Sequence, residues 1–495
     1  MIERAARTAI PLLTGEQLAP MEQQPEPPFR LHTGYGTVVC REVLRFLPGK
    51  RLVVRAEQED EQVIVKCFYG HGAHRDYRRE LTGIKGFINA GIDTPALLGN
   101  SGEQRSLQSI VTADLGRVES LEQAWQQTTL DEQQRRYWLQ KAARLLAQLH
   151  RAGVCQKDLH LDNLLIRNDR LYMIDGGGAT VNTRALSDHQ ARRNLALLMA
   201  VLFPRYDCFA DDVLSAYSSA RLSACAGEKT TAPQWQKTDF LETVLRLRKW
   251  RERFIRKSLR NCTRFRVESS RRHFAAFSRQ YDDASLQALM ANPEAFIADG
   301  KILKSGKTNT LVIISLNNER KVLIKKYQST KGFLHRHLRT LYTSRARKAW
   351  LNGHLLQFLG IDTPSPMAML EHRTGPVVNC SYIITEWVPG THAMAYFDTS
   401  QDPLPEWEQV ASDIGDILIT LKRSCVYHGD LKGNNFLISN NKPLLIDLDA
   451  MTSYKWRFAF KRLFHKDLAR FRRNWKDNPR AAMLFRPVIE AWEQA

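Results

Sequence analysis

The chain has 495 residues, with 72 Lys and Arg against 52 Asp and Glu, which gives a formal net charge of +20. This length predicts two or three domains, and a hydrophobic content of 43% supports packed cores and excludes an intrinsically disordered chain. The eight cysteines form no CxxC pair, which favours reduced thiols over a disulfide framework or a structural zinc site.

The N-terminal segment 1–28 is expected to be a flexible arm, because it has four prolines between residues 20 and 28. It begins with MIERAARTAIPLL, which lacks the apolar core of a secretory signal peptide. The longest apolar stretch, 195–203, is far shorter than a bilayer span and is typical of a buried helix. We therefore expect a cytoplasmic protein.

The first elements after this arm predict a small β-rich lobe. Segments 42–54 and 62–69 are rich in β-branched residues and predict strands, the first one bent at a Pro-Gly turn. An amphipathic pattern over 75–91 predicts a helix, and a second helical pattern follows at 130–153. Residues 188–285 are also expected to be largely helical. A β-rich lobe followed by a helical lobe is the order of elements in a kinase domain.

A phosphoryl-transfer signature follows the second helix and occurs twice in the chain. In each copy an Asp is followed by an Asn five positions on and by another Asp twelve positions later. This is the spacing of a kinase catalytic loop and of the metal-binding Asp that comes after it. The residues are Asp158, Asn163 and Asp175 in the first copy, and Asp430, Asn435 and Asp447 in the second.

Each residue of this signature has a role that phosphoryl transfer requires. The catalytic Asp158 and Asp430 are expected to orient the attacking hydroxyl and accept its proton. The Asn and the second Asp of each copy are expected to hold Mg²⁺ on the phosphate oxygens of ATP. The structural alternative, in which these residues only stabilise turns, does not account for the repetition.

The duplication extends over a whole domain. GIDTP occurs at 91–95 and again at 360–364, an offset of 360 − 91 = 269, against 430 − 158 = 272 for the catalytic loops. The near-constant offset predicts two copies of one fold in tandem. We expect an α+β protein with two bilobal kinase-like domains, the first over 29–288 and the second over 289–495.

The two small lobes carry candidate nucleotide-binding residues. Lys66 and Lys325 lie in short strand segments and are expected to reach the α- and β-phosphates. Glu80, on the following helix, is placed to pair with Lys66. Gly49 and Gly306 lie in the loops LPGKR and KSGKTN, which are expected to cover the phosphates although neither has the full GxGxxG motif.

Each copy departs from the kinase pattern. Gln156 stands where a His usually precedes the catalytic Asp by two positions, whereas the second copy keeps His428. Alignment on GIDTP places Ala349 where the first copy has Glu80, and the second metal-binding segment, IDLDA, adds Asp449. These departures leave a second hypothesis open, in which one or both domains are pseudokinases and the chain is a scaffold.

Positive charge is concentrated in three segments, 246–272, 336–348 and 455–476, the first with twelve Lys or Arg in 27 residues. Basic residues interleaved with Trp, Phe and Leu favour an anionic partner such as an acidic lipid or a phosphorylated glycan. Nucleic acid is disfavoured because no binding module is recognisable, and a solvated helix face is the structural alternative. The candidate contact residues are Arg251, Arg253, Arg256 and Lys257.

The chain resembles the lipopolysaccharide kinase family, the bacterial inner-core heptose and Kdo kinases. The segments that carry the resemblance are 156–166, 172–179, 344–364, 428–438 and 444–451. The resemblance implies an enzyme that uses ATP and Mg²⁺ to phosphorylate a heptose or Kdo hydroxyl of the lipopolysaccharide inner core at the cytoplasmic membrane face. The implied partners are core oligosaccharide or a lipid-linked glycan, with peripheral contact to an anionic membrane.

Two questions stay open at this point. The family usually has a single domain, so the tandem arrangement leaves open whether both sites act. A protein kinase or a small-metabolite kinase of the aminoglycoside or choline type is an alternative enzyme, although neither needs so basic a surface.

Overall fold

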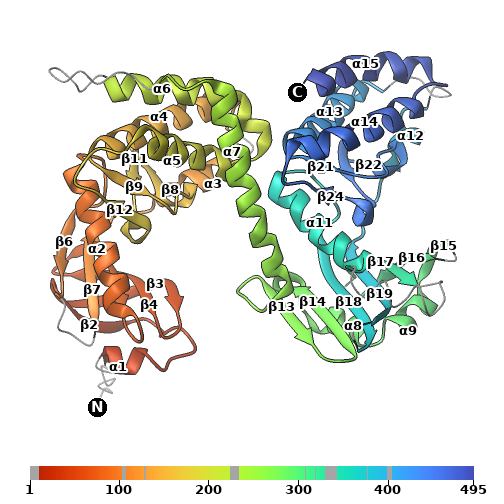
Figure 1. Cartoon of the computed structure of the whole chain (residues 1–495). Coiled ribbons are helices and arrows are strands. Elements are labelled where there is room, and N and C mark those ends of the chain that lie inside the picture. The colour runs from red at the N-terminus through yellow and green to blue at the C-terminus, as the bar shows by residue number, and fades with distance from the viewer. Residues whose placement is uncertain are drawn as a thin grey trace. The chain divides into compact units, whose positions relative to one another are not determined.

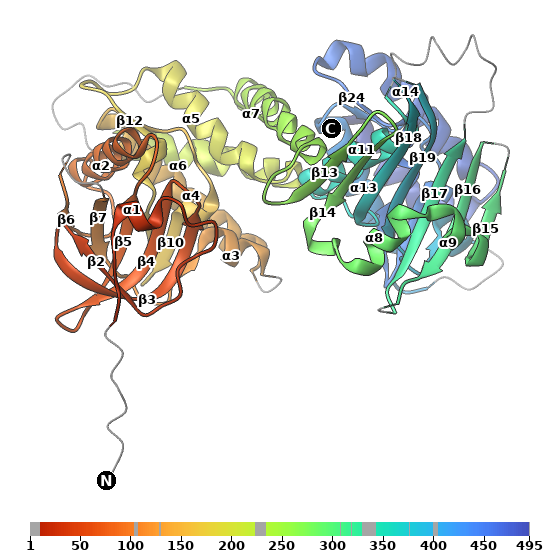
Figure 2. The ribbon, with the colours of Figure 1, turned by 90° about the horizontal axis from the view of Figure 1, so that it is seen from below.

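The computed structural model describes residues 10–102, 107–127, 130–222, 234–306, 308–317, 319–328, 343–375, 377–398 and 404–494. The chain forms two compact units. Unit 1 comprises residues 1–202 and 207–244, and unit 2 comprises residues 203–206 and 245–495. Each unit contains one large sheet and a mainly helical part (Figure 1, Figure 2).

The described part of unit 1 has a seven-stranded sheet in the order β1-β2-β3-β4-β5-β7-β6. Its strands are β1 (Leu12–Leu13), β2 (Phe29–Thr33), β3 (Gly36–Leu47), β4 (Arg51–Gln58), β5 (Glu61–Phe68), β6 (Leu97–Asn100) and β7 (Gln108–Ala113). Alternate residues of β4 are buried, beginning with Leu52 and Val54. This period of two places one face of the sheet on the core.

The rest of unit 1 is built from helices and short hairpins. The helices are α1 (Gly15–Leu18), α2 (Ala73–Asn89), α3 (Leu121–Gln126), α4 (Glu132–Arg151), α5 (Asp188–Val201), α6 (Ala210–Leu222) and the first part of α7 (Lys237–Arg251). The short strands are β8 (Glu119–Ser120), β9 (Val154–Gln156), β10 (Leu164–Arg167), β11 (Arg170–Met173) and β12 (Ala179–Val181). The helices predicted over 75–91 and 130–153 are confirmed as α2 and α4.

Unit 2 has a seven-stranded antiparallel sheet among its described residues, in the order β13-β14-β18-β19-β17-β16-β15. Its strands are β13 (Phe265–Ser269), β14 (His273–Ser278), β15 (Lys301–Ser305), β16 (Asn309–Ser315), β17 (Lys321–Gln328), β18 (Pro366–Thr374) and β19 (Val377–Glu386). The helices are α8 (Ala284–Ala291), α9 (Pro293–Asp299), α11 (Arg345–Leu359), α12 (Ala393–Tyr396), α13 (Trp407–Arg423), α14 (Arg457–Asn474) and α15 (Pro479–Gln494). The short strands are β20 (Thr391–His392), β21 (Val426–Tyr427), β22 (Phe436–Ser439), β23 (Lys442–Leu445) and β24 (Thr452–Ser453).

The two sheets share one five-stranded antiparallel core. Strands β3-β4-β5-β7-β6 of unit 1 correspond to β15-β16-β17-β19-β18 of unit 2, and in each unit a helix, α2 or α11, follows the third strand. Unit 1 extends this core with β2 and β1 beyond β3, whereas unit 2 extends it with β14 and β13 beyond β18, at the opposite edge. The predicted α+β fold of two tandem bilobal kinase-like domains is confirmed.

The structure places the division between the units earlier than the predicted boundary near residue 288. β14 pairs with β18, with Phe274 opposite Glu371, so residues 265–278 belong to the sheet of unit 2. The units divide between Val244 and Leu245. The assignment of segment 246–272 to the first domain and the prediction of helix over residues 265–278 are therefore wrong. β14 is buried on both faces, so it lacks the alternation that marks a half-buried strand.

The predicted flexible arm 1–28 is also wrong for the residues that the structure describes, which begin at residue 10. β1 pairs in parallel with β2, and Leu18 of α1 is fully buried in the core of the sheet. A capping box between Thr14 and Gln17 fixes the start of α1. Residues 1–9 lie outside the described ranges.

Within the described ranges, no helix has both the length and the apolar character that a membrane crossing requires. The apolar stretch 195–203 falls mainly in α5, where most of its side chains are buried, as predicted.

The helical core of unit 2 predicts a specific loss of stability. Trp475 is 2% exposed and stacks on Phe485 with ring centroids 4.4 Å apart. Trp475→Ala should lower the free energy of unfolding of unit 2 by about 3–5 kcal/mol, because it leaves a large cavity. Calorimetry or denaturant titration would measure this. The control is Trp456→Ala, since Trp456 is 55% exposed; equal losses in the two variants would contradict the assigned core.

Candidate active sites

In unit 1 a chain of hydrogen bonds joins the three signature residues. Asn163 Nδ2 donates to the carbonyl oxygen of Asp158 at 3.0 Å, and Ile174 N donates to the carbonyl oxygen of Asn163 at 3.0 Å. Gln156 Nε2 donates to the carbonyl oxygen of Asp175 at 2.9 Å, and its Oε1 accepts from Asp158 N at 3.2 Å. The structure therefore brings the catalytic loop and the metal-binding Asp together.

Unit 2 repeats this network. Asn435 Nδ2 donates to the carbonyl oxygen of Asp430 at 2.7 Å, and Ile446 N donates to the carbonyl oxygen of Asn435 at 2.9 Å. His428 Nε2 lies 3.2 Å from the carbonyl oxygen of Ile446, and Asp430 N donates to His428 Nδ1 at 3.4 Å. Asp447 follows Ile446 directly, so the second triplet also converges.

The two metal-binding aspartates share an unusual backbone conformation. Asp175 has φ 66° and ψ 75°, and Asp447 has φ 64° and ψ 58°. This left-handed region is costly for residues other than glycine and is concentrated at functional sites. Its presence in both copies is consistent with a role for these carboxylates, and the roles of the signature residues stay predictions.

Gln156 makes two hydrogen bonds of the same kind as His428, although its acceptor is the carbonyl oxygen of Asp175 and that of His428 belongs to Ile446, one position earlier in the equivalent segment. Both side chains are fully buried, and each donates toward a carbonyl at the strand end while accepting from the N–H of the catalytic Asp. This pattern requires a neutral imidazole that is protonated at Nε2. Burial lowers the pKa of His428 to about 4, so the ring is neutral at pH 7. The departure at Gln156 therefore preserves the geometry of the loop.

In each unit a side chain of a neighbouring helix forms a hydrogen bond with the backbone of the catalytic loop, and neither of these two residues was identified from the sequence. In unit 1, Asn194 of α5 donates to the carbonyl oxygen of Gln156 at 2.6 Å. In unit 2, Asp467 of α14 accepts from His428 N at 2.8 Å and Gly429 N at 3.4 Å, and burial raises its pKa to about 6. The duplication contained a usable signal, since these residues follow the catalytic Asp by 194 − 158 = 36 and 467 − 430 = 37 positions.

On the nucleotide side of unit 1, a lysine lies between two carboxylates. Lys66 Nζ of β5 is 2.5 Å from Glu80 Oε1 and 3.8 Å from Asp175 Oδ1. Glu80 is 1% exposed and also accepts from Gly176 N at 3.2 Å and Gly177 N at 2.9 Å. Burial raises the pKa of Glu80. Burial would also raise the pKa of Asp175, but the charge of Lys66 holds it below its usual range.

Unit 2 arranges the same groups differently. Lys325 Nζ of β17 is 2.5 Å from Asp447 Oδ1 and 3.9 Å from Asp449 Oδ1. Arg345, at the start of α11, pairs with the other oxygen of Asp449. Although burial opposes ionisation, Lys325 lowers the pKa of Asp447 to about 2. Ala349 is buried on α11 and offers no charge.

The two candidate glycines lie in equivalent turns. Gly49 joins β3 to β4 and Gly306 joins β15 to β16, which are the first two strands of the shared five-stranded core. Gly49 has φ +65°, a conformation that favours glycine. On either side of its turn, Arg51 and Arg45 add positive charge that helps to lower the pKa of Asp175. This first turn therefore carries cations that act on the metal-binding end of the site.

The donor atoms in both units fit Mg²⁺ delivered with a nucleotide. Because Asn163 and Asn435 use their side-chain nitrogen to hold the catalytic loop, their amide oxygens are directed away from it. Mg²⁺ needs only one or two protein carboxylates when phosphates and water complete its shell. Among the described residues no group of three or more His, Cys, Asp and Glu could hold a metal, which is compatible with this mode.

The structure places the candidate anionic-partner residues in unit 2, at the end of α7 and in the following turn of 3₁₀-helix, Glu252–Leu259. Arg253, Arg256 and Lys257 are exposed and Arg251 is half-buried. The Arg253 guanidinium lies 3.5 Å from the centre of the Trp250 ring, which is itself 48% exposed. Of the basic segment 336–348, residues 336–342 lie outside the described ranges.

Comparison with known proteins gives one family match. The model of the lipopolysaccharide kinase (Kdo/WaaP) family matches residues 69–203 and 300–484, more than half of the chain, with one signature in each range. A solved structure of vaccinia related kinase 3 matches 46% of this chain and 88% of that chain, with 11% identity and a TM-score of 0.30. No curated protein matches the chain.

The equivalence of Gln156 and His428 predicts that His428→Gln keeps unit 2 folded and changes its pH dependence. The folded pKa of His428, about 4, lies below its ordinary value of 6.5. As the pH falls below about 6.5, this histidine is protonated in the unfolded state but stays neutral in the folded state until about pH 4. The free energy of unfolding of unit 2 therefore decreases between about pH 6.5 and pH 4. Between pH 7.5 and 5 the wild type should lose about 2 kcal/mol more unfolding free energy than His428→Gln.

Denaturant titration at the two pH values measures this difference, and other buried histidines cancel because both proteins contain them. His428→Ala is the control, since it should destabilise unit 2 at both pH values by leaving two polar backbone groups unpaired. Parallel losses in the wild type and His428→Gln would refute the assignment.

Proposed function

The chain belongs to the Kdo/WaaP family of lipopolysaccharide kinases, and we propose that it transfers phosphate from ATP to a heptose or Kdo hydroxyl of the lipopolysaccharide inner core. It is a phosphotransferase of the kinase type, and family membership implies ATP as the donor. The observation that supports the reaction most is that both units join lysine, catalytic Asp, Asn and metal-binding Asp in one connected network.

In this proposal the catalytic Asp orients the sugar hydroxyl and accepts its proton, while the lysine holds the nucleotide phosphates. Bound Mg²⁺ would supply charge neutralisation on the phosphates. Each catalytic Asp already has a basic neighbour: His160 Nε2 is 3.3 Å from Asp158 Oδ1, and Lys432 Nζ is 2.9 Å from Asp430 Oδ2. These contacts restrict the orientations that the two carboxylates can adopt. Neither was identified from the sequence.

We also propose that unit 2 touches an anionic membrane through α14, at the cytoplasmic face. Most of the exposed basic residues of this helix and of the residues just after it share one face, which we term the α14 basic face: Lys461, Arg462, His465, Lys466, Arg472, Arg473 and Lys476. Phe458 is 78% exposed and lies three residues before Lys461, on the same side of the helix. Cations around an exposed aromatic ring are typical of an interfacial helix.

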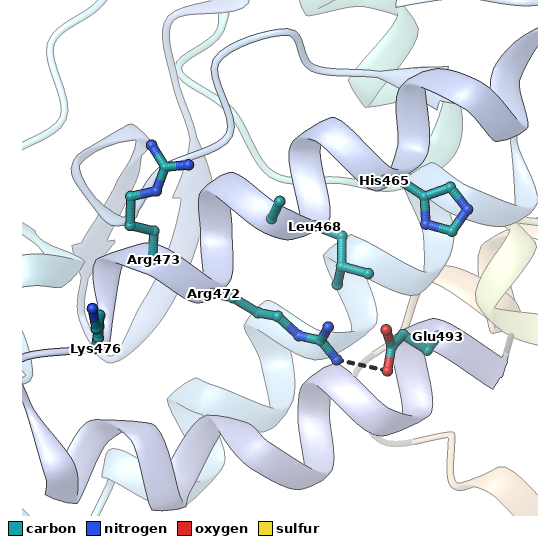
Figure 3. A pocket seen from close by; sticks show the side chains of 7 residues that line it. His465, Leu468, Arg472, Arg473, Lys476 and Glu493 are labelled. Atoms are coloured by element: carbon teal, nitrogen blue, oxygen red, sulfur yellow. Dashed lines mark ion pairs between the residues drawn. The ribbon is translucent and has the colours of Figure 1, made fainter.

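Figure 3 shows part of this face, where His465, Leu468, Arg472, Arg473 and Lys476 are among the residues that line a surface pocket. Glu493 of α15 pairs with Arg472 at 2.7 Å and leaves the other cations to face solvent. The same helix reaches the active site, since Arg470 Nη1 lies 3.6 Å from Asp430 Oδ1. In this proposal a lipid-linked acceptor would bind the helix that also contacts the catalytic Asp of unit 2, although Arg470 lies outside the α14 basic face.

The scaffold hypothesis was motivated by Gln156 and Ala349, and since Gln156 keeps the hydrogen bonds of its loop, Ala349 is the departure that still favours it. The alternative of a protein kinase or a small-metabolite kinase leaves the α14 basic face without a role. Both remain outcomes of the experiments below.

Replacing the catalytic aspartates should separate the two sites. Asp158→Asn and Asp430→Asn should each reduce transfer at their own site by about 10²–10⁴-fold, the usual effect of removing a positioned base. Transfer of labelled phosphate from ATP to purified core oligosaccharide measures the reaction, and the two single variants divide the activity between the units. Normal transfer by the double variant would overturn the catalytic assignment, whereas a wild type that transfers no phosphate would favour the scaffold.

Neutralising the α14 basic face should weaken membrane binding. Arg472→Gln, Arg473→Gln and Lys476→Gln together should reduce affinity for phosphatidylglycerol vesicles by about a hundredfold, since each cation contributes roughly 1 kcal/mol near an anionic surface. Phe458→Ala should add to this loss. Vesicle co-sedimentation at two salt concentrations measures both effects.

The matched control neutralises three exposed arginines of unit 1, Arg41, Arg75 and Arg170, for the same change in charge. A further variant neutralises Arg251, Arg253, Arg256 and Lys257. If the control and the α14 variant lost vesicle affinity equally, net charge alone would explain the loss and the proposed membrane contact would be refuted. Phosphate transfer to soluble oligosaccharide should be unchanged in all of these variants.

A further inference from the structure

The two copies differ reciprocally at one pair of positions beside the lysine. Glu80 of α2 corresponds to Ala349 of α11, at the offset 349 − 80 = 269, and Gly177 corresponds to Asp449, at the offset 449 − 177 = 272. One copy thus has a carboxylate on the helix and glycine in the loop. The other has alanine on the helix and a carboxylate in the loop.

In unit 1 the helix carboxylate lies where a loop side chain would begin. Glu80 Oε2 accepts from Gly177 N at 2.9 Å, and a Cβ atom at Gly177 would lie only 2.9 Å from the same oxygen. A side chain at position 177 would therefore force the Glu80 carboxylate to shift from its contacts with Lys66 and with the loop N–H groups.

In unit 2 the loop side chain is present and the helix side chain is short. Asp449 is 8% exposed and directs one carboxylate oxygen toward Lys325 Nζ, at 3.9 Å, and the other toward Arg345 of α11. Ala349, one turn after Arg345, has no carboxylate to compete with it. The contact between helix and loop is therefore an ion pair in unit 2, with the cation on the helix and the anion in the loop, whereas in unit 1 the helix carboxylate accepts hydrogen bonds from backbone N–H groups of the loop.

The loop that carries Asp449 is held in place by α11. Asn352 Nδ2 donates to the carbonyl oxygens of Leu448 at 2.8 Å and Met451 at 3.1 Å, on both sides of Asp449. The equivalent residue of unit 1, Gly83, instead packs directly against Gly176. Both units thus fix the loop to the helix, so the position of Asp449 is set by the fold.

We propose that Asp449 is the residue that positions Lys325 in the second active site, in place of the helix glutamate. Lys325 is closest to Asp447, but Asp447 is also the expected metal ligand and cannot be a dedicated partner of the lysine. Asp449 is within ion-pair range and is itself held by Arg345. This inference rests on the proposed kinase function, and it makes unit 2 a complete nucleotide site despite Ala349.

The test exchanges the two carboxylates within unit 2, in a Lys66→Ala background that removes the nucleotide lysine of unit 1. Asp449→Gly and the near-isosteric Asp449→Asn should each weaken binding of Mg²⁺ with a non-hydrolysable ATP analogue by about tenfold, the loss expected when a partly buried lysine loses one ion-pair partner. Ala349→Glu alone should also weaken binding, because two carboxylates then compete for one space. Ala349→Glu with Asp449→Gly recreates the pair of unit 1 and should restore binding.

Titration calorimetry measures nucleotide affinity, and the unfolding transition of unit 2 without nucleotide shows whether each variant is folded. Unchanged affinity in both Asp449 variants, or a double variant that binds no better than Asp449→Gly, would overturn the proposal. Because the readout is nucleotide binding, it does not depend on the acceptor. Failure to phosphorylate core sugar would therefore count against the proposed function and leave this inference standing.

Discussion

A lysine on an inner strand of the β-sheet, held between carboxylates, is the interaction on which both candidate active sites depend. Lys66 and Lys325 come from the third strand of the shared sheet core, and their acidic partners come from the loop after the catalytic hairpin and, in unit 1, from the helix. An ammonium group in partly buried surroundings needs such partners. The ion pairs thus join strand, helix and loop, so the small lobe and the metal-binding end of each unit are held together.

The duplication shows which properties of the site are constrained and which are not. Gln156 and His428 differ in chemistry but present the same donor and acceptor to the backbone, and Asn194 and Asp467 both support the loop from a helix behind it. Hydrogen-bonding geometry is therefore retained where residue identity is not. A carboxylate near the lysine is retained in the same way: unit 1 supplies it from the helix, with Glu80 opposite Gly177, and unit 2 supplies it from the loop, with Asp449 opposite Ala349.

Outside the sites the two units have diverged more. The sheets share five strands, but each is lengthened at a different edge, by β1 and β2 in unit 1 and by β13 and β14 in unit 2. Addition at an edge leaves the shared strands and the lysine undisturbed, because only unpaired backbone groups are used. The α14 basic face likewise lies outside the set of signature residues in unit 2. This is consistent with the proposal that it contacts the membrane and takes no part in phosphate transfer.

The sequence by itself determined the kinase-like fold, the tandem arrangement and the signature residues, because fixed spacings and β-branched or amphipathic periods are one-dimensional properties of the chain. Tertiary structure alone decided the division at residue 244, the ordering of residues 10–28 and the partner of Lys325. Arg345 and Asp449 are 104 residues apart, and β14 pairs with a strand almost as distant from it. Such contacts form only when distant segments pack, and no local pattern encodes which segments those are.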